Sequence, residues 1–185
     1  KVFTPFWRNA EQKYLSLPPS KNYIVKKKSK SILFFNYIIE PKNILPKSNW
    51  YKKFEEYWKV SENDSKKALN DLIDKKIKDY GTTRDFPSIE GTSKLSPYIK
   101  HGQIHVSTIW QKCNEIKSKG IGYRKYINEL GWREFAHSLI NYFPEFLKGN
   151  YRKEFDRFPW VKNDKFLKAW KSGMTGYPIV DAGMR

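Results

Sequence analysis

The chain has 185 residues, and its 36 lysines and arginines against 19 acidic residues give a formal net charge of +17. This length suits one domain of ordinary size or a piece of a larger protein. The longest apolar stretch, residues 31–39, is too short to span a bilayer, and residues 1–10 lack the apolar core of a signal peptide, so we expect neither a membrane-embedded nor an exported protein.

The net charge indicates which kind of partner the protein binds, and the cysteine content indicates its cellular compartment. A basic surplus of this size indicates a polyanionic partner, because each neutralised phosphate releases counterions, although a solvated lysine-rich surface explains it equally well. The single cysteine, Cys113, excludes an internal disulfide, so we expect a reducing cytosolic or nuclear compartment.

Residues 1–62 are rich in proline and lysine and only weakly periodic, as in "LPPSKN" and "EPKNILPKSNW". This texture is typical of a linker, so we expect an irregular wrapping segment that ends at residue 62. The basic run "KKKSK" resembles a nuclear import signal, but a solvated linker run is the better interpretation.

From residue 63 onward, apolar residues recur at helical spacing without an alternating strand pattern, so the sequence predicts an all-α fold for residues 63–185. A first helix is predicted over 63–81, with Asn63 or Asp64 as its N-cap and Gly81 as its end. Two further helices are predicted to begin at the N-caps Ser96 and Ser107, and two more are predicted over 123–143 and 164–173. A last helix opens near Pro178 and the sequence stops after one or two turns, which indicates a domain incomplete at its C-terminus.

The most informative loop is residues 91–96, "GTSKLS", which lies between two predicted helices. A glycine lets the backbone approach a ligand, hydroxyls and free N–H groups at a helix start bind phosphate oxygens, and the lysine supplies charge. Hydroxyl-rich loops before helices are more often simple caps, and the spacing of a Walker loop is missing. The residues alone leave a phosphate site and a helix cap as open alternatives.

The helix predicted over 123–143 presents two neighbouring stripes. The first is apolar and predicts ordinary core: Gly131, Phe135, Leu139 and Tyr142. The second mixes charged and apolar types: Glu129, Trp132, Arg133, Ala136 and Ile140. A solvated face rarely contains tryptophan and a core face rarely contains glutamate and arginine, so this stripe is either a binding face or a packed rim with a Glu–Arg ion pair.

Two other candidates lead to no site. His101 and His105 stand at a spacing found in metal sites, but no acid flanks them and a third ligand is missing, so no metal site is predicted. Cys113 lies inside a predicted helix between Trp110 and Ile116, so we expect it to be buried and inert.

Four stretches, in this order and spacing, resemble the DNA photolyase/cryptochrome family: "RDFPSIEGTSKLSPYI", "NELGWREFAHSLINYFPE", "FDRFPW" and "FLKAWKSGMTGYPIVDAGMR". They are most similar to bacterial class I cyclobutane pyrimidine dimer photolyases over residues 80–185, and "FTPFW" is similar to the linker that enters the flavin domain. The resemblance implies a helical FAD-binding domain, of which the chain contains the linker and the first part. It also implies a monomeric enzyme of the bacterial cytoplasm.

The resemblance implies which residues hold cofactors. FAD would contact Tyr80 and the loop residues Thr92, Ser93, Lys94, Leu95 and Ser96. Lys94 stands where many members carry arginine, and either residue provides a cation. An antenna pterin, methenyltetrahydrofolate, is expected in a full-length parent, where Lys148 falls near a position that touches the pterin in some members.

The resemblance also implies contacts with DNA containing pyrimidine dimers. Arg84 matches a DNA-contacting position, and four residues would face or border the flipped-out dimer: Glu129, Trp132, Arg133 and Ala136. Glu129 would hydrogen-bond the thymine edge, and Trp160 matches the surface-most tryptophan of a chain that photoreduces the flavin. Glu129 and Trp160 are therefore the catalytic candidates.

The implied reaction is light-driven repair, in which photoexcited reduced FAD donates an electron to the dimer. Two alternatives stay open at this point. One is a cryptochrome-type FAD photoreceptor without repair activity, and the other is a non-catalytic basic helical module that binds nucleic acid.

Overall fold

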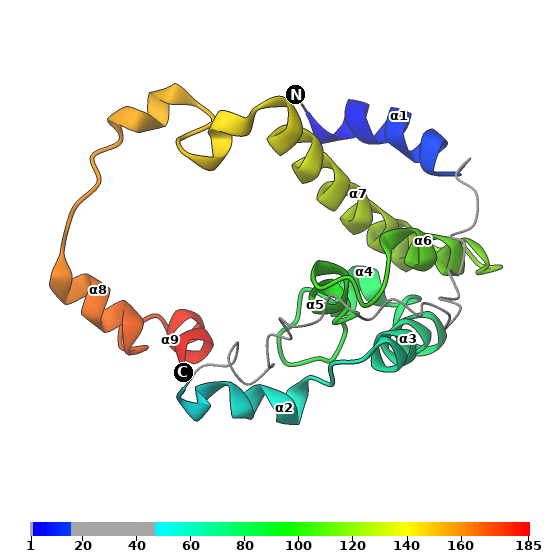
Figure 1. Cartoon of the computed structure of the whole chain (residues 1–185), viewed down its shortest axis with the longest axis horizontal. Helices are drawn as coiled ribbons and strands as arrows, with labels where there is room; N and C mark the ends of the chain where they lie inside the picture. Colours follow the sequence, from blue (N-terminus) through cyan, green and yellow to red (C-terminus); the bar gives the residue numbers. More distant parts are fainter. Residues whose placement is uncertain (1, 16–46) are drawn as a thin grey trace, which may run out of the picture. The chain divides into compact units, whose positions relative to one another are not determined.

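The computed structural model describes residues 2–15 and 47–185, which are helical without any β-strand (Figure 1). The prediction of an all-α fold is thereby confirmed. The chain forms two compact units, Lys1–His137 and Ser138–Arg185, so residues on both sides of the boundary expected at residue 62 belong to the first unit. The apolar stretch 31–39 and the run "KKKSK" lie outside the described residues.

The first unit contains most of the helices. They are α1 (Phe3–Leu15), η2 (Asn49–Lys53), α2 (Phe54–Tyr57), α3 (Glu62–Asp71), η3 (Leu72–Lys76), α4 (Tyr80–Thr83), α5 (Ser96–Lys100), α6 (Val106–Asn114) and α7 (Ile121–Tyr142), whose last turns belong to the second unit. The second unit continues with η4 (Pro144–Leu147), η5 (Lys153–Arg157), α8 (Asp164–Lys171) and α9 (Pro178–Met184). The helices predicted over 123–143, over 164–173 and from Pro178 are thus confirmed as α7, α8 and α9.

Helix α1 corrects the prediction of an irregular N-terminal segment, which is wrong for residues 3–15. Phe3, Phe6, Trp7 and Ala10 recur at helical spacing, and all four belong to or pack against the buried core. Short sequences of this kind form helices mainly because an apolar face is buried in tertiary contacts. The high proline content of residues 1–62 led to the prediction of an irregular segment, although the helical spacing of these apolar residues was present in the sequence.

Helix α3 begins and ends differently from its prediction. Its N-cap is Ser61 rather than Asn63 or Asp64, because the Ser61 hydroxyl accepts a hydrogen bond from the Asp64 amide at 3.1 Å. The helix continues into the π-helical turn η3, closed by the Ile77 amide and the Leu72 carbonyl at 2.8 Å. Residues five apart point to different sides of an α-helix, whereas the wider π turn lets Leu72 and Ile77 both be buried.

The caps of α5 and α6 also differ from the expectation. Leu95 rather than Ser96 precedes α5, and Pro97 stands in its first turn. His105 rather than Ser107 caps α6, since its Nδ1 accepts a hydrogen bond from the Ser107 amide at 3.2 Å. Gly81 lies inside α4 and does not end a helix.

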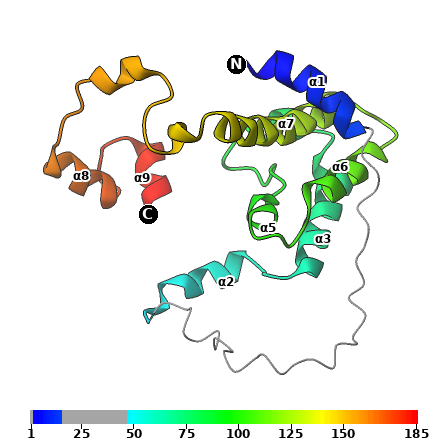
Figure 2. The ribbon, with the colours of Figure 1, turned by 45° about the horizontal axis from the view of Figure 1, so that its top comes forward.

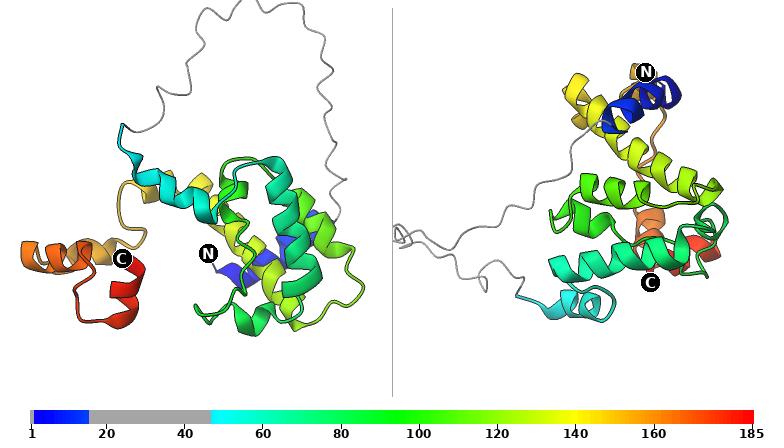
Figure 3. Two further views of the ribbon diagram at one scale, coloured as in Figure 1. Left: turned by 90° about the horizontal axis from the view of Figure 1, so that it is seen from below. Right: turned by 90° about the vertical axis from the view of Figure 1, so that its right-hand side faces the viewer.

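Helix α7 is the element against which the first unit packs. In Figures 1 and 2, α1 runs alongside its middle part, and the views of Figure 3 agree. A Cβ on Gly131 would stand 2.6–2.9 Å from ring carbons of Trp7, and a Cβ on Gly122 would stand 2.1 Å from the Ile77 carbonyl oxygen. Both glycines are therefore required by close approach of neighbouring elements.

The buried face of α7 lies earlier in the helix than predicted. Its buried residues are Gly122, Tyr123, Tyr126, Ile127, Leu130 and Gly131. Tyr142, expected in the core stripe, is 73% exposed. The expectation failed because the apolar pattern alone does not show where the packing partners end.

The second unit is organised locally around one buried carboxylate. Asp181 of α9 accepts hydrogen bonds from the amide and hydroxyl of Thr175, at 2.7 and 2.6 Å, and from the Gly176 amide at 3.0 Å. These donors, the Thr175 hydroxyl first, hold the pKa of Asp181 below its ordinary value. The loop before α9 is thus fixed by the helix that follows it.

We predict that replacing Gly131 with alanine lowers the free energy of unfolding by about 1–3 kcal/mol, because the new methyl group overlaps the Trp7 ring. At an exposed helical position the same change stabilises by about 1 kcal/mol, so the sign of the effect reports on the contact. Urea unfolding followed by circular dichroism measures it.

Gly120 provides the control, because a Cβ there meets no atom within 4 Å. Gly120→Ala should stay within about 0.5 kcal/mol of the parent. A Gly131→Ala protein as stable as the parent would contradict the close approach of α1 to α7.

Candidate functional site

A cavity of about 630 Å³ lies within the first unit, a size in the range of ligand sites. Its walls come from four separate segments of the chain. The lining residues are Trp58, Tyr80, Thr92, Ser93, Lys94, Leu95, Ser96, Ile99, Tyr126, Glu129, Leu130 and Arg133. All six residues predicted to hold the cofactor are among them, together with two of the residues predicted to face the substrate.

The loop of residues 91–96 is shaped by tight local packing. A Cβ on Gly91 would lie 2.6 Å from side-chain atoms of Thr83, so the loop passes directly against α4. Lys94 adopts the left-handed conformation with a φ of 53°, and the Ser93 hydroxyl accepts a hydrogen bond from the Leu95 amide at 3.3 Å. This turn brings consecutive hydroxyl and cationic side chains to one wall of the cavity.

Two tyrosines form an aromatic part of the wall. The Tyr80 and Tyr126 rings meet edge to face, with centroids 5.1 Å apart at 90°. Burial raises the pKa of both phenols, and a hydrogen bond between Tyr126 and Ser93 opposes the shift for Tyr126. Both hydroxyls therefore stay protonated at neutral pH and are neutral groups facing the cavity region.

Glu129 is ion-paired with Arg84, which follows α4 directly. The guanidinium also lies 5.5 Å from the centre of the Tyr80 ring and 3.6 Å from Asp85. Its hydrogen bond with Glu129 raises the pKa of Arg84. Arg84, predicted to contact DNA, is thus engaged with a residue of the cavity wall.

Arg133 lines the cavity but bonds to the adjacent Glu134 rather than to Glu129. The packed-rim interpretation therefore holds in part: Glu129 does pair with an arginine, and that arginine comes from another element. The pairing could not be read from helical spacing, because Arg84 is far from Glu129 in sequence.

Trp132 and Ala136 are outside the set of cavity-lining residues. The Trp132 ring stacks on Phe3 of α1, with centroids 3.7 Å apart and planes 9° from parallel, and it meets the edge of Phe135. It is still 48% exposed. The residues of the predicted binding stripe are thus divided between the cavity and the contact with α1.

Trp160 lies in the second unit, where it is 76% exposed and its ring centroid is 4.7 Å from that of Phe158. Lys148 is exposed and follows η4 in the same unit. Cys113 is buried as predicted, and burial raises the pKa of its thiol to about 12, which makes it inert.

Sequence reasoning missed four cavity residues: Trp58, Ile99, Tyr126 and Leu130. Tyr126 stands three residues before Glu129 on a helix that was predicted, so its helical spacing was an available signal. Trp58 lies in the segment interpreted as a linker, and nothing in its local sequence indicated a wall residue.

Neither a membrane span nor a metal site is found among the described residues. In the part of the chain that the structure describes, no helix is both long and apolar enough to cross a membrane. Among the same residues, no cluster of three or more His, Cys, Asp or Glu side chains is placed to bind a metal ion.

Comparison with known proteins gives a consistent result. The sequence pattern of the FAD binding domain of DNA photolyase matches residues 126–185. A protein of Agrobacterium fabrum named deoxyribodipyrimidine photo-lyase is 37% identical over 100% of this chain and 39% of its own length. One of Buchnera aphidicola with the same name is 30% identical over 100% of this chain and 38% of its length. The chain spans about two fifths of the length of these relatives.

Solved structures agree with the sequence comparison. A bacterial class III photolyase from Agrobacterium tumefaciens superposes with a TM-score of 0.76 and 35% identity over 100% of this chain and 39% of that one. A cryptochrome from Synechocystis gives a TM-score of 0.74 and 25% identity over the same shares. The resemblance to class I in particular stays a prediction.

We predict that Arg84 and Glu129 are energetically coupled. Their side chains are 28% and 36% exposed, so solvent screens the pair only in part, and a double-mutant cycle with alanine should give a coupling of about 1 kcal/mol. Urea unfolding of the two single variants and the double variant measures it.

The exposed pair of Lys112 and Glu115, with side chains 51% and 63% exposed, is the control and should couple by only about 0.3 kcal/mol. Equal coupling in the two cycles would show that the Arg84–Glu129 contact has no special role in the wall.

Proposed function

Since this chain belongs to the DNA photolyase/cryptochrome family, we propose that it is part of an enzyme that repairs cyclobutane pyrimidine dimers in DNA with light. We propose that the cavity of the first unit holds FAD. The observation that carries the proposal is that Tyr80 and the whole run Thr92–Ser96 line a single cavity.

The chemistry of the cavity fits a flavin dinucleotide. Hydroxyls of Thr92, Ser93 and Ser96 and the ammonium of Lys94 are donors of the kind that bind a diphosphate. The walls also contain aromatic and aliphatic side chains, which suit flat rings: Trp58, Tyr80, Leu95, Ile99, Tyr126 and Leu130. Lys94 is paired with Glu90, whose side chain is 75% exposed, so a phosphate would replace a weak partner.

When bound in reduced form, FAD supplies the electron that photoexcitation makes available for splitting the dimer. The residues of the chain bind and orient the cofactor. The loop holds the negatively charged part of the cofactor, and the aromatic wall excludes water from its rings. Trp160, exposed in the second unit, is proposed as an entry point for electrons that keep the cofactor reduced.

Glu129 is proposed to receive the damaged base. Its carboxylate pairs with Arg84, and a carboxylate accepts a hydrogen bond from a thymine N–H more strongly than a neutral acceptor does. Arg133 and the exposed part of Trp132 would border the same base, and Ala136 continues their stripe along α7. The net charge of +17 would supply attraction to DNA phosphates.

A cryptochrome-type photoreceptor is the second candidate, and the fold shared with the Synechocystis cryptochrome favours it. The same cavity would then serve light sensing. Repair of an ultraviolet-treated oligonucleotide under blue light, absent in the dark, separates the two functions.

We predict that Thr92→Ala combined with Ser93→Ala weakens FAD binding by the full-length protein about tenfold or more. Two hydroxyl donors to a charged ligand are lost, each contributing about 0.5–1.5 kcal/mol or more. Flavin fluorescence during equilibrium dialysis gives the dissociation constant.

Thr82→Ala is the control, since its hydroxyl bonds to the Asp79 carbonyl at 2.9 Å, the residue does not line the cavity, and it is not the threonine that packs against Gly91. The control should retain FAD as the parent does. Full FAD occupancy in the Thr92/Ser93 variant would place the cofactor elsewhere.

We predict that Glu129→Ala lowers the number of dimers repaired per absorbed photon about ten- to hundredfold, as expected when a hydrogen bond to a charged group is lost. Affinity for the damaged oligonucleotide should fall less, because phosphate contacts provide most of it. Glu134→Ala, which removes the partner of Arg133 on the same helix, should change neither quantity by more than about twofold. Parallel losses in damaged and undamaged binding would argue for a purely structural role of Glu129.

A further inference from the structure

We propose that the hydroxyl of Tyr98 is a clasp that holds Trp58 on the cavity wall and so slows the release of the ligand bound there. Tyr98 acts through the backbone of Lys59 and is a positioning residue, while Trp58 lines the cavity itself. The inference rests on the proposed function, because it takes FAD as the ligand.

Trp58 follows a segment whose side chains are mostly exposed. Helices η2 and α2, which lead to it, contain no buried residue, and side chains on both sides of Trp58 are largely exposed. Tyr57 is 77% exposed and Val60 is 81% exposed, whereas Trp58 is half-buried. The indole is therefore one of the few contacts that this segment makes with the rest of the unit, and its position depends on how the backbone beside it is held.

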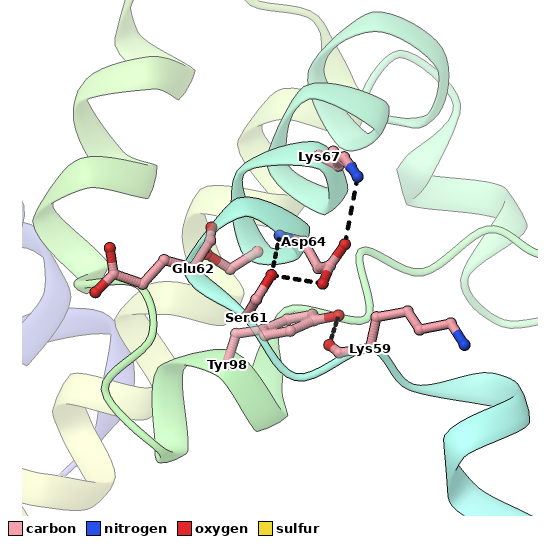
Figure 4. Close-up of polar contacts among 7 residues, drawn as sticks. Lys59, Ser61, Glu62, Asp64, Lys67 and Tyr98 are labelled. Carbon is pink, nitrogen blue, oxygen red and sulfur yellow. Dashed lines mark hydrogen bonds and ion pairs between the residues drawn. The ribbon is translucent and has the colours of Figure 1, made fainter.

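The Tyr98–Lys59 hydrogen bond supplies that hold. The Tyr98 hydroxyl donates to the Lys59 carbonyl oxygen at 2.7 Å, across 39 residues of sequence, and Figure 4 shows the end of the Tyr98 side chain meeting the backbone of Lys59. The bond between the Trp58 amide and the Phe54 carbonyl, by contrast, is local to the segment. The rings of Trp58 and Tyr98 also meet edge to face, with centroids 6.4 Å apart.

Tyr98 is well placed to act as a fixed donor. It belongs to α5, directly after the hydroxyl loop, and is only 6% exposed. Burial raises the pKa of its phenol, so the hydroxyl remains protonated and able to donate across the neutral range. The same short helix thus connects the loop proposed to bind phosphate with the segment that carries Trp58.

The chain is anchored again immediately after Lys59. The Ser61 hydroxyl contacts Asp64 at 2.5 Å, and Lys67 extends this contact at 3.5 Å from Asp64, as Figure 4 shows. Ser65, which is fully buried, donates to the Glu62 carbonyl at 2.7 Å. The start of α3 is therefore fixed, and without the clasp the backbone before Ser61 can swing about Val60.

The experiment compares Tyr98→Phe with Tyr123→Phe in the full-length protein. Tyr123 is the matched control, because it is 7% exposed, its hydroxyl donates to Asn114 at 2.8 Å, and it does not line the cavity. Each variant keeps its ring and loses one hydrogen bond. Only Tyr98→Phe should release FAD faster, by about 3- to 10-fold, while both lose similar thermal stability as apoproteins.

A second measurement does not depend on the flavin. Trypsin should cut the flavin-free Tyr98→Phe protein after Lys52, Lys53 and Lys59 several times faster than the parent, whereas Tyr123→Phe should be cut at the parental rate. If the parent binds no FAD, the proposed function fails, and this cleavage still decides whether the clasp exists. If the parent binds FAD and Tyr98→Phe matches it in both release and cleavage, the clasp is overturned and the proposed function stands.

Trp58→Leu tests the connection between clasp and wall. It should release FAD faster on its own, and adding Tyr98→Phe should accelerate release no further, because the clasp acts through the indole. Additive effects would overturn that connection. Should Tyr98→Phe fail to fold, unchanged FAD release in Trp58→Leu would itself overturn the proposal.

Discussion

The close contact between Trp7 and Gly131 is the constraint on which the first unit depends. Because Gly131 has no side chain, the indole of α1 lies against the backbone of α7, and its ring also meets Trp110 of α6 edge to face. A second close approach at Gly122 fixes the start of α7 on the backbone of Ile77. Gly131 and Gly122 are nine residues apart and therefore lie on opposite sides of α7. The side of Gly131 is covered by α1, and the opposite side, which carries Tyr126, Glu129, Leu130 and Arg133, forms the cavity wall beyond Gly122.

The cavity combines segments with different degrees of attachment. Helix α7 and the loop of residues 91–96 are held by close backbone packing, at Gly131 and at Gly91 respectively. In the described part of the segment that carries Trp58, helices η2 and α2 contain no buried residue, and its contacts include the long-range hydrogen bond from Tyr98 and the aromatic contact with the same residue. A site that must admit a large ligand and then retain it needs at least one wall that opens at modest cost, and the weakly attached segment is the part of the wall that can do so.

The fold class and helices α7, α8 and α9 could be predicted from the sequence, because each has a strong local signature. Periodicity identified α7 and α8. The hydroxyl-rich run drew attention to residues 92–96, which line the cavity, but left a phosphate site and a helix cap as alternatives. Contacts between distant segments were not predictable from local signals. The Trp58 ring contacts that of Tyr98, 40 positions later, and the partner of Glu129 is Arg84.

Errors at helix ends have the same origin. Asn63, Ser96 and Ser107 are all good capping types, yet Ser61, Leu95 and His105 occupy the N-cap positions. Where several residues of capping type lie close together, the one that becomes the N-cap is the one from which the helix turns its apolar residues toward the core. Ser65 and Leu69, both buried in α3, determine that choice for the first helix after the linker.

The two ion pairs at the cavity differ in how easily a ligand can separate their partners. Lys94 and Glu90 are 46% and 75% exposed, so the surrounding water weakens their attraction and an incoming phosphate exchanges with Glu90 at little cost. Arg84 and Glu129 are 28% and 36% exposed, and Arg84 also packs over Tyr80, so separating them costs more. A ligand that reaches Glu129 is therefore accepted with Arg84 still in place. The cation would then offset the negative charge that Glu129 brings close to a diphosphate, so that an acidic residue and the proposed anionic cofactor could share one cavity.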